Sequence, residues 1–147
     1  MLAPLANAQP TPTRTAAQSD SRCAGRRFKA SARPARASAI GQSALQREAK
    51  NLQSLAAEGS LLAGDAARGR STAVFTREHA GFLHAAAAAA TANTLARGSR
   101  PLARLAARVT DDLARLARSG SDGAEQKRLA ADLTSAAKAA AKLGQKL

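Results

Sequence analysis

The spacing of the leucines is the feature that most limits what this chain can fold into. From Leu45 to Leu147 they recur at helical intervals on a background made largely of alanine. Intervals that alternate between three and four residues form a heptad seam on one face of a helix, as in coiled coils and helical bundles. One seam comprises Leu129, Leu133, Ala136, Ala140, Leu143 and Leu147, and a second comprises Leu102, Leu105, Val109, Leu113 and Leu116.

Helix-breaking residues divide this region at short intervals, which predicts four helices joined by connections of a few residues. Because short connections force neighbouring helices to run antiparallel, we expect an all-α fold, an up-down-up-down four-helix bundle. The alternative is a pair of helical hairpins that meets a second copy of itself. The expected helices span about residues 40–68, 72–97, 101–118 and 123–146.

Polar side chains mark the expected helix starts. Thr72 or the serine before it is expected to cap the second helix. Asp122 with Glu125 predicts a capping box for the fourth helix, and Ser43 with Gln46 predicts one near the start of the first.

The core of the bundle is expected to contain few large side chains. Hydrophobic residues make up 45% of the chain, but more than half of them are alanine, and there is no Trp or Tyr. Since alanine contributes helix propensity and little burial, we expect a thin core that benefits from a partner chain.

The second helix is expected to bury a face that combines large and small residues. This face consists of Phe75, His79, Phe82, Ala86, Ala89 and Asn93.

The first 39 residues differ in composition from the helical region, residues 40–147. They hold four of the five prolines and show no sustained apolar period, so we expect a disordered basic leader. The formal net charge of the whole chain is +13. Against the single acid Asp20, residues 1–38 carry Arg14, Arg22, Arg26, Arg27, Lys29, Arg33 and Arg36.

Three interpretations of this leader remain open. An Arg- and Ser-rich, acid-poor segment is typical of an organellar transit peptide, with removal expected near Ala39. The small residues of Leu5-Ala6-Asn7-Ala8 fit the end of a longer signal peptide whose start was misassigned, which would mean export. The third interpretation is a disordered tail of a cytoplasmic protein.

His79 and Glu58 form the strongest candidate for chemistry. If the chain turns near Gly69, residues ten before and ten after the turn meet, which places Glu58 near His79. Such a pair orients a metal ligand or a general base in some enzymes. More often a core-facing histidine is simply hydrogen-bonded to a carboxylate, so we expect a polar core pair without a metal or cofactor.

Motifs that would indicate an enzyme are missing from the sequence. There is no Gly-rich phosphate loop, no nucleophile elbow and no HExxH spacing. The lone Cys23 cannot form an intramolecular disulfide, and no segment has the roughly 20 apolar residues of a transmembrane helix. We therefore expect a protein that is not an enzyme.

Basic side chains line two expected helices. On the third helix they lie opposite the leucines, and Asp111 is expected to pair with the arginine four residues later. Such faces contact phosphates without reading sequence, although a solvated helix face is the more frequent explanation. The candidate anion-binding face consists of Arg104, Arg108, Arg115 and Arg118, with Lys138, Lys142 and Lys146 on the fourth helix.

Residues 55–80, LAAEGSLLAGDAARGRSTAVFTREHA, resemble a segment of small alanine-rich helical proteins of high-GC bacteria. Those proteins are exported or membrane-tethered and uncharacterised. The resemblance covers mainly residues 40–97. It implies the same bundle and a location outside the cytoplasm, and it implies no activity. This chain departs from the pattern because it lacks an intact signal peptide.

Three functions are therefore expected in descending order. The first is a structural or protein-interaction module that works through a helix face or through self-association. The second is sequence-nonspecific binding of nucleic acid or another anion by the basic faces. The third is a metal or catalytic site around His79 and Glu58.

Overall fold

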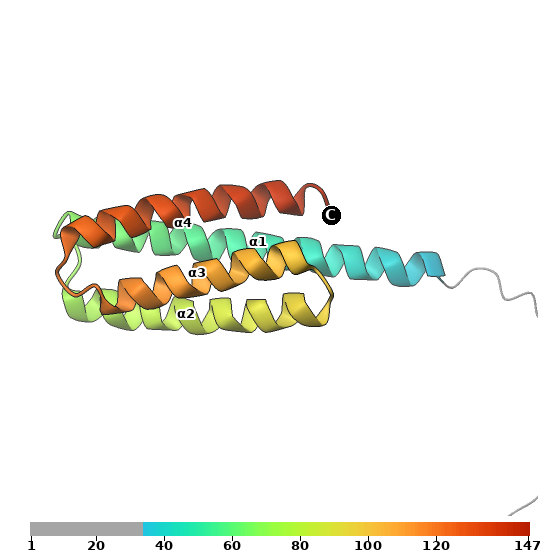
Figure 1. Ribbon diagram of the computed structural model, residues 1–147, viewed down its shortest axis with the longest axis horizontal. Helices are drawn as coiled ribbons and strands as arrows, with labels where there is room; N and C mark the ends of the chain where they lie inside the picture. The colour runs from blue at the N-terminus through green and yellow to red at the C-terminus, as the bar shows by residue number, and fades with distance from the viewer. Residues whose placement is uncertain (1–33) are drawn as a thin grey trace, which may run out of the picture. The chain divides into compact units, whose positions relative to one another are not determined.

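The computed structural model describes the backbone of residues 34–147 and the side chains of residues 41–147. This part of the chain contains four helices and no strand, and successive helices run in opposite directions (Figure 1). The predicted all-α, up-down-up-down bundle is confirmed. The helices are α1 (Pro34–Ala67), α2 (Ala73–Ala96), α3 (Arg100–Arg118) and α4 (Gly123–Gly144).

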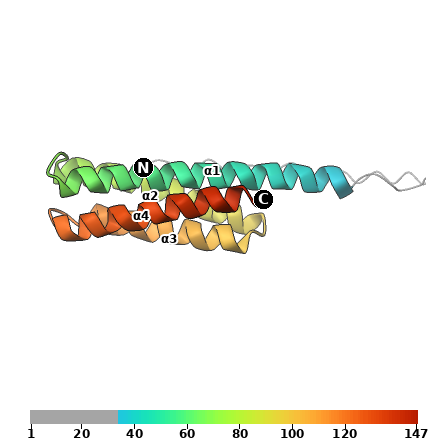
Figure 2. The same cartoon turned by 90° about the horizontal axis from the view of Figure 1, so that it is seen from above.

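α1 begins earlier than the sequence predicts. Its first residue is Pro34, six residues before Ile40, and proline suits the first turn because it has no N–H to leave unpaired. Ser43 therefore lies inside α1, and the capping box predicted there is wrong. The helix extends past the ends of the other three (Figure 2). Residues 1–33 lie outside the described part of the chain, so the three interpretations of the leader stay predictions.

The other three helices begin within one residue of the expected positions. Thr72 caps α2, because its hydroxyl accepts a hydrogen bond from the N–H of Phe75 at 3.2 Å. Asp122 caps α4 by accepting from the N–H groups of Ala124 and Glu125, each at 3.1 Å. The carboxylate of Glu125 contacts Arg115 on α3. The second half of the predicted capping box is therefore wrong, because the N–H of Asp122 donates to the carbonyl of Ser119 and Glu125 pairs with α3 instead.

The bundle consists of two closely packed antiparallel pairs, α1 with α4 and α2 with α3. Small residues line these contacts. A Cβ atom at Gly144 of α4 would lie 3.2 Å from the Cβ of Ala49 of α1, and Ala103 and Ala106 of α3 are buried. Leucines fill the space between the two pairs. The predicted seams of α3 and α4 are confirmed: Leu105, Leu143 and Leu147 are partly buried against the core, and the other members are fully buried, namely Leu102, Val109, Leu113, Leu116, Leu129, Leu133, Ala136 and Ala140.

The predicted buried face of α2 is wrong by one residue. α2 carries two parallel rows of residues at intervals of three and four, and it buries the row with the smaller side chains. That row packs where α2 approaches α3 closely, and a phenylalanine there would hold the two helices apart. Phe75 and Phe82 are instead 55% and 70% exposed. The buried row consists of Thr76, Ala80, Leu83, Ala87, Ala90 and Thr94.

Candidate interaction surface

The structure brings His79 and Glu58 together across α1 and α2. Nε2 of His79 lies 2.8 Å from Oε1 of Glu58, as the position of the turn predicts. The two side chains remain 33% and 52% exposed, so the expectation of a core pair is wrong. The reason is the change of buried row on α2, which leaves His79 at the surface between the two helices.

Two phenylalanines flank His79 on the surface of α2. The ring of Phe75 stacks on the imidazole with centroids 5.5 Å apart and an interplanar angle of 8°. Phe82 lies on the other side at 6.4 Å, tilted by 33°. The described residues contain no group of three or more His, Cys, Asp and Glu side chains that could hold a metal ion. The three rings form an aromatic row.

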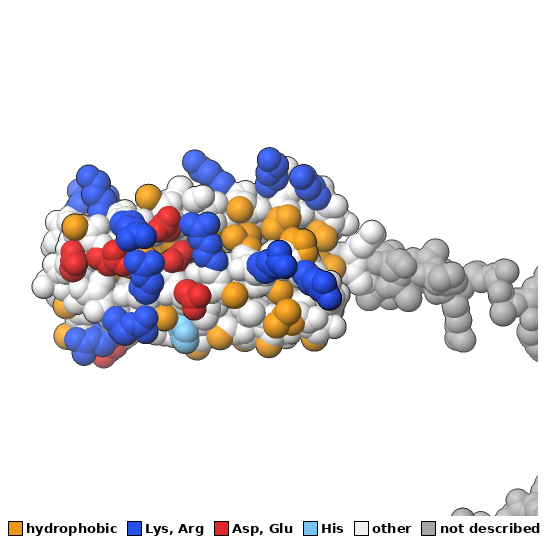
Figure 3. Space-filling model, viewed as in Figure 1, with side chains coloured by type: hydrophobic (Ala, Val, Ile, Leu, Met, Phe, Trp, Pro, Cys, Tyr) orange, Lys and Arg blue, Asp and Glu red, His pale blue; other side chains and the backbone are white. Residues whose placement is uncertain are grey.

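The outward side of α2 is apolar over most of its length. Four of the five large apolar side chains that are exposed in residues 41–147 lie on this helix: Val74, Phe75, Phe82 and Leu95. After Glu78 the helix contains no Asp, Glu, Lys or Arg. Figure 3 shows apolar side chains along the edge of the molecule where Figure 1 places α2.

Within this surface, seven exposed residues follow one another at intervals of three and four. We call them the outer α2 seam. These residues point away from the row of α2 that packs on α3. The large side chains of the seam all lie in the N-terminal half of α2. The outer α2 seam consists of Phe75, Glu78, Phe82, Ala85, Ala89, Ala92 and Ala96. Sequence periodicity alone could not distinguish this row from its neighbours, because all share the same spacing.

The predicted arginine stripe on α3 is interrupted by ion pairs with α4. Nη2 of Arg108 lies 3.3 Å from Oδ1 of Asp132. Arg115 contacts Glu125 and lies 3.8 Å from Oδ1 of Asp112. The predicted pairing of Arg115 with Asp111 is wrong, since Glu125 at the start of α4 and the neighbouring Asp112 take its guanidinium. Arg108 and Arg115 are therefore engaged within the bundle.

Asp112 is the buried member of this charged cluster. Its side chain is 8% exposed, and Oδ2 has no hydrogen-bond partner. Burial raises the pKa of the Asp112 carboxyl, and the nearby carboxylate of Asp132 raises it further, against the lowering effect of Arg108 and Arg115. The leucine seam of α3 does distinguish this aspartate from Asp111, because Asp112 lies three residues after Val109 and four before Leu116, whereas Asp111 lies on the opposite side of the helix.

The remaining members of the predicted anion-binding face are exposed, and none forms an ion pair with a described residue. They are Arg104, Arg118, Lys138, Lys142 and Lys146. The structure therefore splits the predicted face into engaged and free cations.

Three of these free cations lie at one end of the bundle, whereas Arg118 lies at the opposite end of α3. α1 passes the end of α4 there, where Gly144 approaches Ala49, and it passes the end of α2, where Asn93 donates to Glu48 at 3.4 Å. The same end carries Arg97 and Arg100 at the turn between α2 and α3, together with Arg104, Lys142 and Lys146. We call these five residues the basic end. Figure 3 shows part of this charge on the side of the molecule nearest the start of α1.

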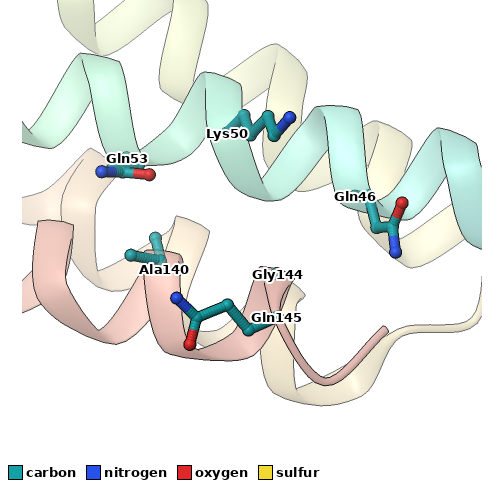
Figure 4. A pocket seen from close by; sticks show the side chains of 7 residues that line it. Gln46, Lys50, Gln53, Ala140, Gly144 and Gln145 are labelled. Carbon is teal, nitrogen blue, oxygen red and sulfur yellow. The ribbon is translucent and has the colours of Figure 1, made fainter.

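A shallow groove of about 400 Å³ runs between α1 and α4 near the basic end. Figure 4 shows the side chains of Gln46, Lys50 and Gln53 along α1 and that of Gln145 on α4. Ala140 and Gly144 leave the space open, because neither carries a large side chain. Lys50 is the single ionisable residue in its lining, so the groove offers hydrogen bonds and one positive charge but no acid–base pair.

Comparison of the chain with known protein families, with curated proteins and with solved structures finds no match. The resemblance of residues 55–80 to exported or membrane-tethered proteins stays a prediction. Among the described residues, no helix combines the length and apolar character needed to cross a membrane.

Proposed function

We propose that this protein is a non-enzymatic interaction module that binds another helix through the outer α2 seam. The observation that supports the proposal is the concentration of exposed apolar side chains on α2, together with the lack of charged residues after Glu78. Contiguous exposed apolar surface on a soluble domain typically marks an interaction site. A helix that is apolar on its outward as well as its inward side is typical of a buried helix.

The spacing of the seam indicates the kind of partner. Residues at intervals of three and four form a straight row that matches the same row on a second helix. Phe82 is 70% exposed in the free chain. Full burial of a phenylalanine contributes about 1.5–3 kcal/mol, so the two rings supply much of the binding free energy.

Site-specific photo-crosslinking in the native cell tests this proposal. A photoreactive residue replaces Ala85 on the seam, and a matched chain carries it at Leu61, an exposed apolar position on α1. We expect discrete protein adducts from position 85 and none of the same mass from position 61. Equal adduct patterns from the two positions, or no adduct from position 85, would contradict the proposal.

A second candidate function is electrostatic binding of a polyanion at the basic end. It is supported by the free cations there, which no described carboxylate neutralises. Unpaired Lys and Arg side chains bind phosphates by releasing counterions, so the affinity falls steeply as salt rises. The outer α2 seam and the basic end involve different residues, so the two functions are separable.

Two double variants separate free from engaged arginines. Arg100 and Arg104 belong to the basic end, whereas Arg108 and Arg115 pair with carboxylates of the bundle. We expect replacement of the first pair by Gln to weaken binding of a fluorescent DNA duplex and to lower its salt dependence by about two phosphate contacts. Replacement of the second pair should change DNA binding much less. Equal losses in both variants, or no binding at low salt, would contradict this function.

A further inference from the structure

We infer that the occupant of the outer α2 seam is the same seam of a second copy of this chain, in antiparallel orientation. The inference depends on the proposed interaction function and specifies its partner. It is carried by the uneven distribution of side-chain size along the seam. Both phenylalanines lie in the N-terminal half, and the C-terminal half consists of alanine.

Antiparallel pairing places large residues against small ones. When two copies of the seam are related by a two-fold axis that passes between residues 83 and 84, the six positions from Phe75 to Ala92 face one another in pairs. Phe75 faces Ala92 of the second copy, and Phe82 faces Ala85. Each ring therefore enters a space that an alanine leaves open, which is the size complementarity that close helix packing needs.

The same arrangement also satisfies the one charge on the seam. Glu78 faces Ala89 of the second copy, so its carboxylate does not lie against a like charge. A parallel arrangement would instead place Glu78 against Glu78 and Phe82 against Phe82. Like charges directly opposite each other destabilise a pair of helices, so size and charge both favour the antiparallel arrangement.

The chain already packs its own helices in this way. α2 meets α3 through an antiparallel contact lined by alanine, and α1 meets α4 through another. The paired part of the seam extends from Phe75 to Ala92, which is about 26 Å at 1.5 Å per residue. A helix about 10 Å wide then offers roughly 260 Å² of projected surface, less than the roughly 800 Å² per partner of a standard interface. We therefore expect a reversible dimer that depends on concentration.

Sedimentation equilibrium of the full chain tests the dimer. We expect the wild-type protein to pass from monomer to dimer as its concentration rises toward about 1 mM. Phe82→Glu should raise the dissociation constant at least about tenfold, because it buries two unpaired charges in the contact. Leu61→Glu is the matched control, since Leu61 is 69% exposed but lies on the side of α1 that faces α4. This variant should dimerise like the wild type.

Spin labels measure the orientation. In a chain with Cys23→Ser and Arg97→Cys, labels at the end of α2 should lie about 40 Å apart along the helix axis in the antiparallel dimer. A separation below about 20 Å would indicate a parallel pair and overturn the arrangement.

Monomeric wild-type protein at about 1 mM, or equal dimerisation of the Phe82→Glu variant, would overturn self-association. A different pair of results would contradict the inference of a second copy and leave the proposed interaction function standing. If the crosslinker at position 85 captures a different protein and the purified chain stays monomeric, the seam is an interaction surface and the inference of a second copy is wrong. Circular dichroism of each variant confirms that the helices remain folded.

Discussion

The backbone of Gly59 on α1 lies directly against the side chain of Leu113 on α3, in the centre of the bundle. A Cβ atom at residue 59 would lie 2.6 Å from Cδ2 of Leu113 and 3.2 Å from Cδ1 of Leu133 on α4. Both leucines are fully buried, so neither has free space into which to move. The glycine that weakens α1 as a helix thus allows three helices to converge.

Gly59→Ala should therefore destabilise the protein. Overpacking of a core typically costs about 1–3 kcal/mol, and alanine recovers up to about 1 kcal/mol of helix propensity, so we expect a net loss of roughly 1–2 kcal/mol. Urea denaturation measures the change. Gly81→Ala is the control, because nothing lies within 4 Å of a Cβ there, and it should gain up to about 1 kcal/mol. Equal effects of the two substitutions would contradict the packing explanation.

Asp112→Asn should raise the melting temperature at pH 7. The pKa of Asp112 is raised from 3.8 in the folded state by burial and by Asp132. Between pH 3.8 and this higher pKa, the folded protein binds more protons than the unfolded chain, so its stability falls as pH rises through this interval. Asparagine at residue 112 does not ionise, so the variant does not lose this stability as the pH rises.

Thermal unfolding from pH 3 to pH 7 measures this difference between variant and wild type. The gain should be complete above the folded-state pKa and should disappear below about pH 3.8, where both side chains are neutral. Asp111→Asn provides the control at the adjacent, exposed position. A lower melting temperature for Asp112→Asn at pH 7 would mean that the ion pairs with Arg108 and Arg115 outweigh the burial of the charge.

His79→Gln should leave the fold intact and change stability by less than about 1 kcal/mol. The contact between His79 and Glu58 is partly exposed, and exposed polar pairs of this kind contribute about 0–1 kcal/mol. Melting curves with and without Zn²⁺ separate this role from the metal-site hypothesis. A rise in melting temperature that requires both Zn²⁺ and His79 would support the metal-site hypothesis and contradict this prediction.

Asp122→Ala should destabilise α4 by about 0.5–2 kcal/mol, since the carboxylate accepts hydrogen bonds from two N–H groups at the start of the helix. Asp122→Asn keeps an acceptor and should retain most of the stability. Chemical denaturation of the two variants measures the difference, and equal losses would show that the cap contributes little.

The starts of α2, α3 and α4 and most of the core could be predicted, because capping groups act locally and leucines repeat at helical spacing. Thr72 and Asp122 cap helices with groups that lie within three residues, so no distant contact affects them. Leu113 and Leu133 belong to the predicted leucine seams, and both are fully buried. The meeting of Glu58 and His79 was predictable for a similar reason, because a short turn fixes which residues face each other across it.

Sequence alone thus determined the number of helices, the caps of α2 and α4, the antiparallel order and the leucine seams. Tertiary structure alone decided which row of α2 is buried and which arginines pair with carboxylates of α4. Phe75 and Thr76 belong to rows with the same period, so only the close approach of α2 to α3 selects the smaller one. Arg108 and Arg104 look alike in the sequence, and they differ because α4 brings a carboxylate to one of them.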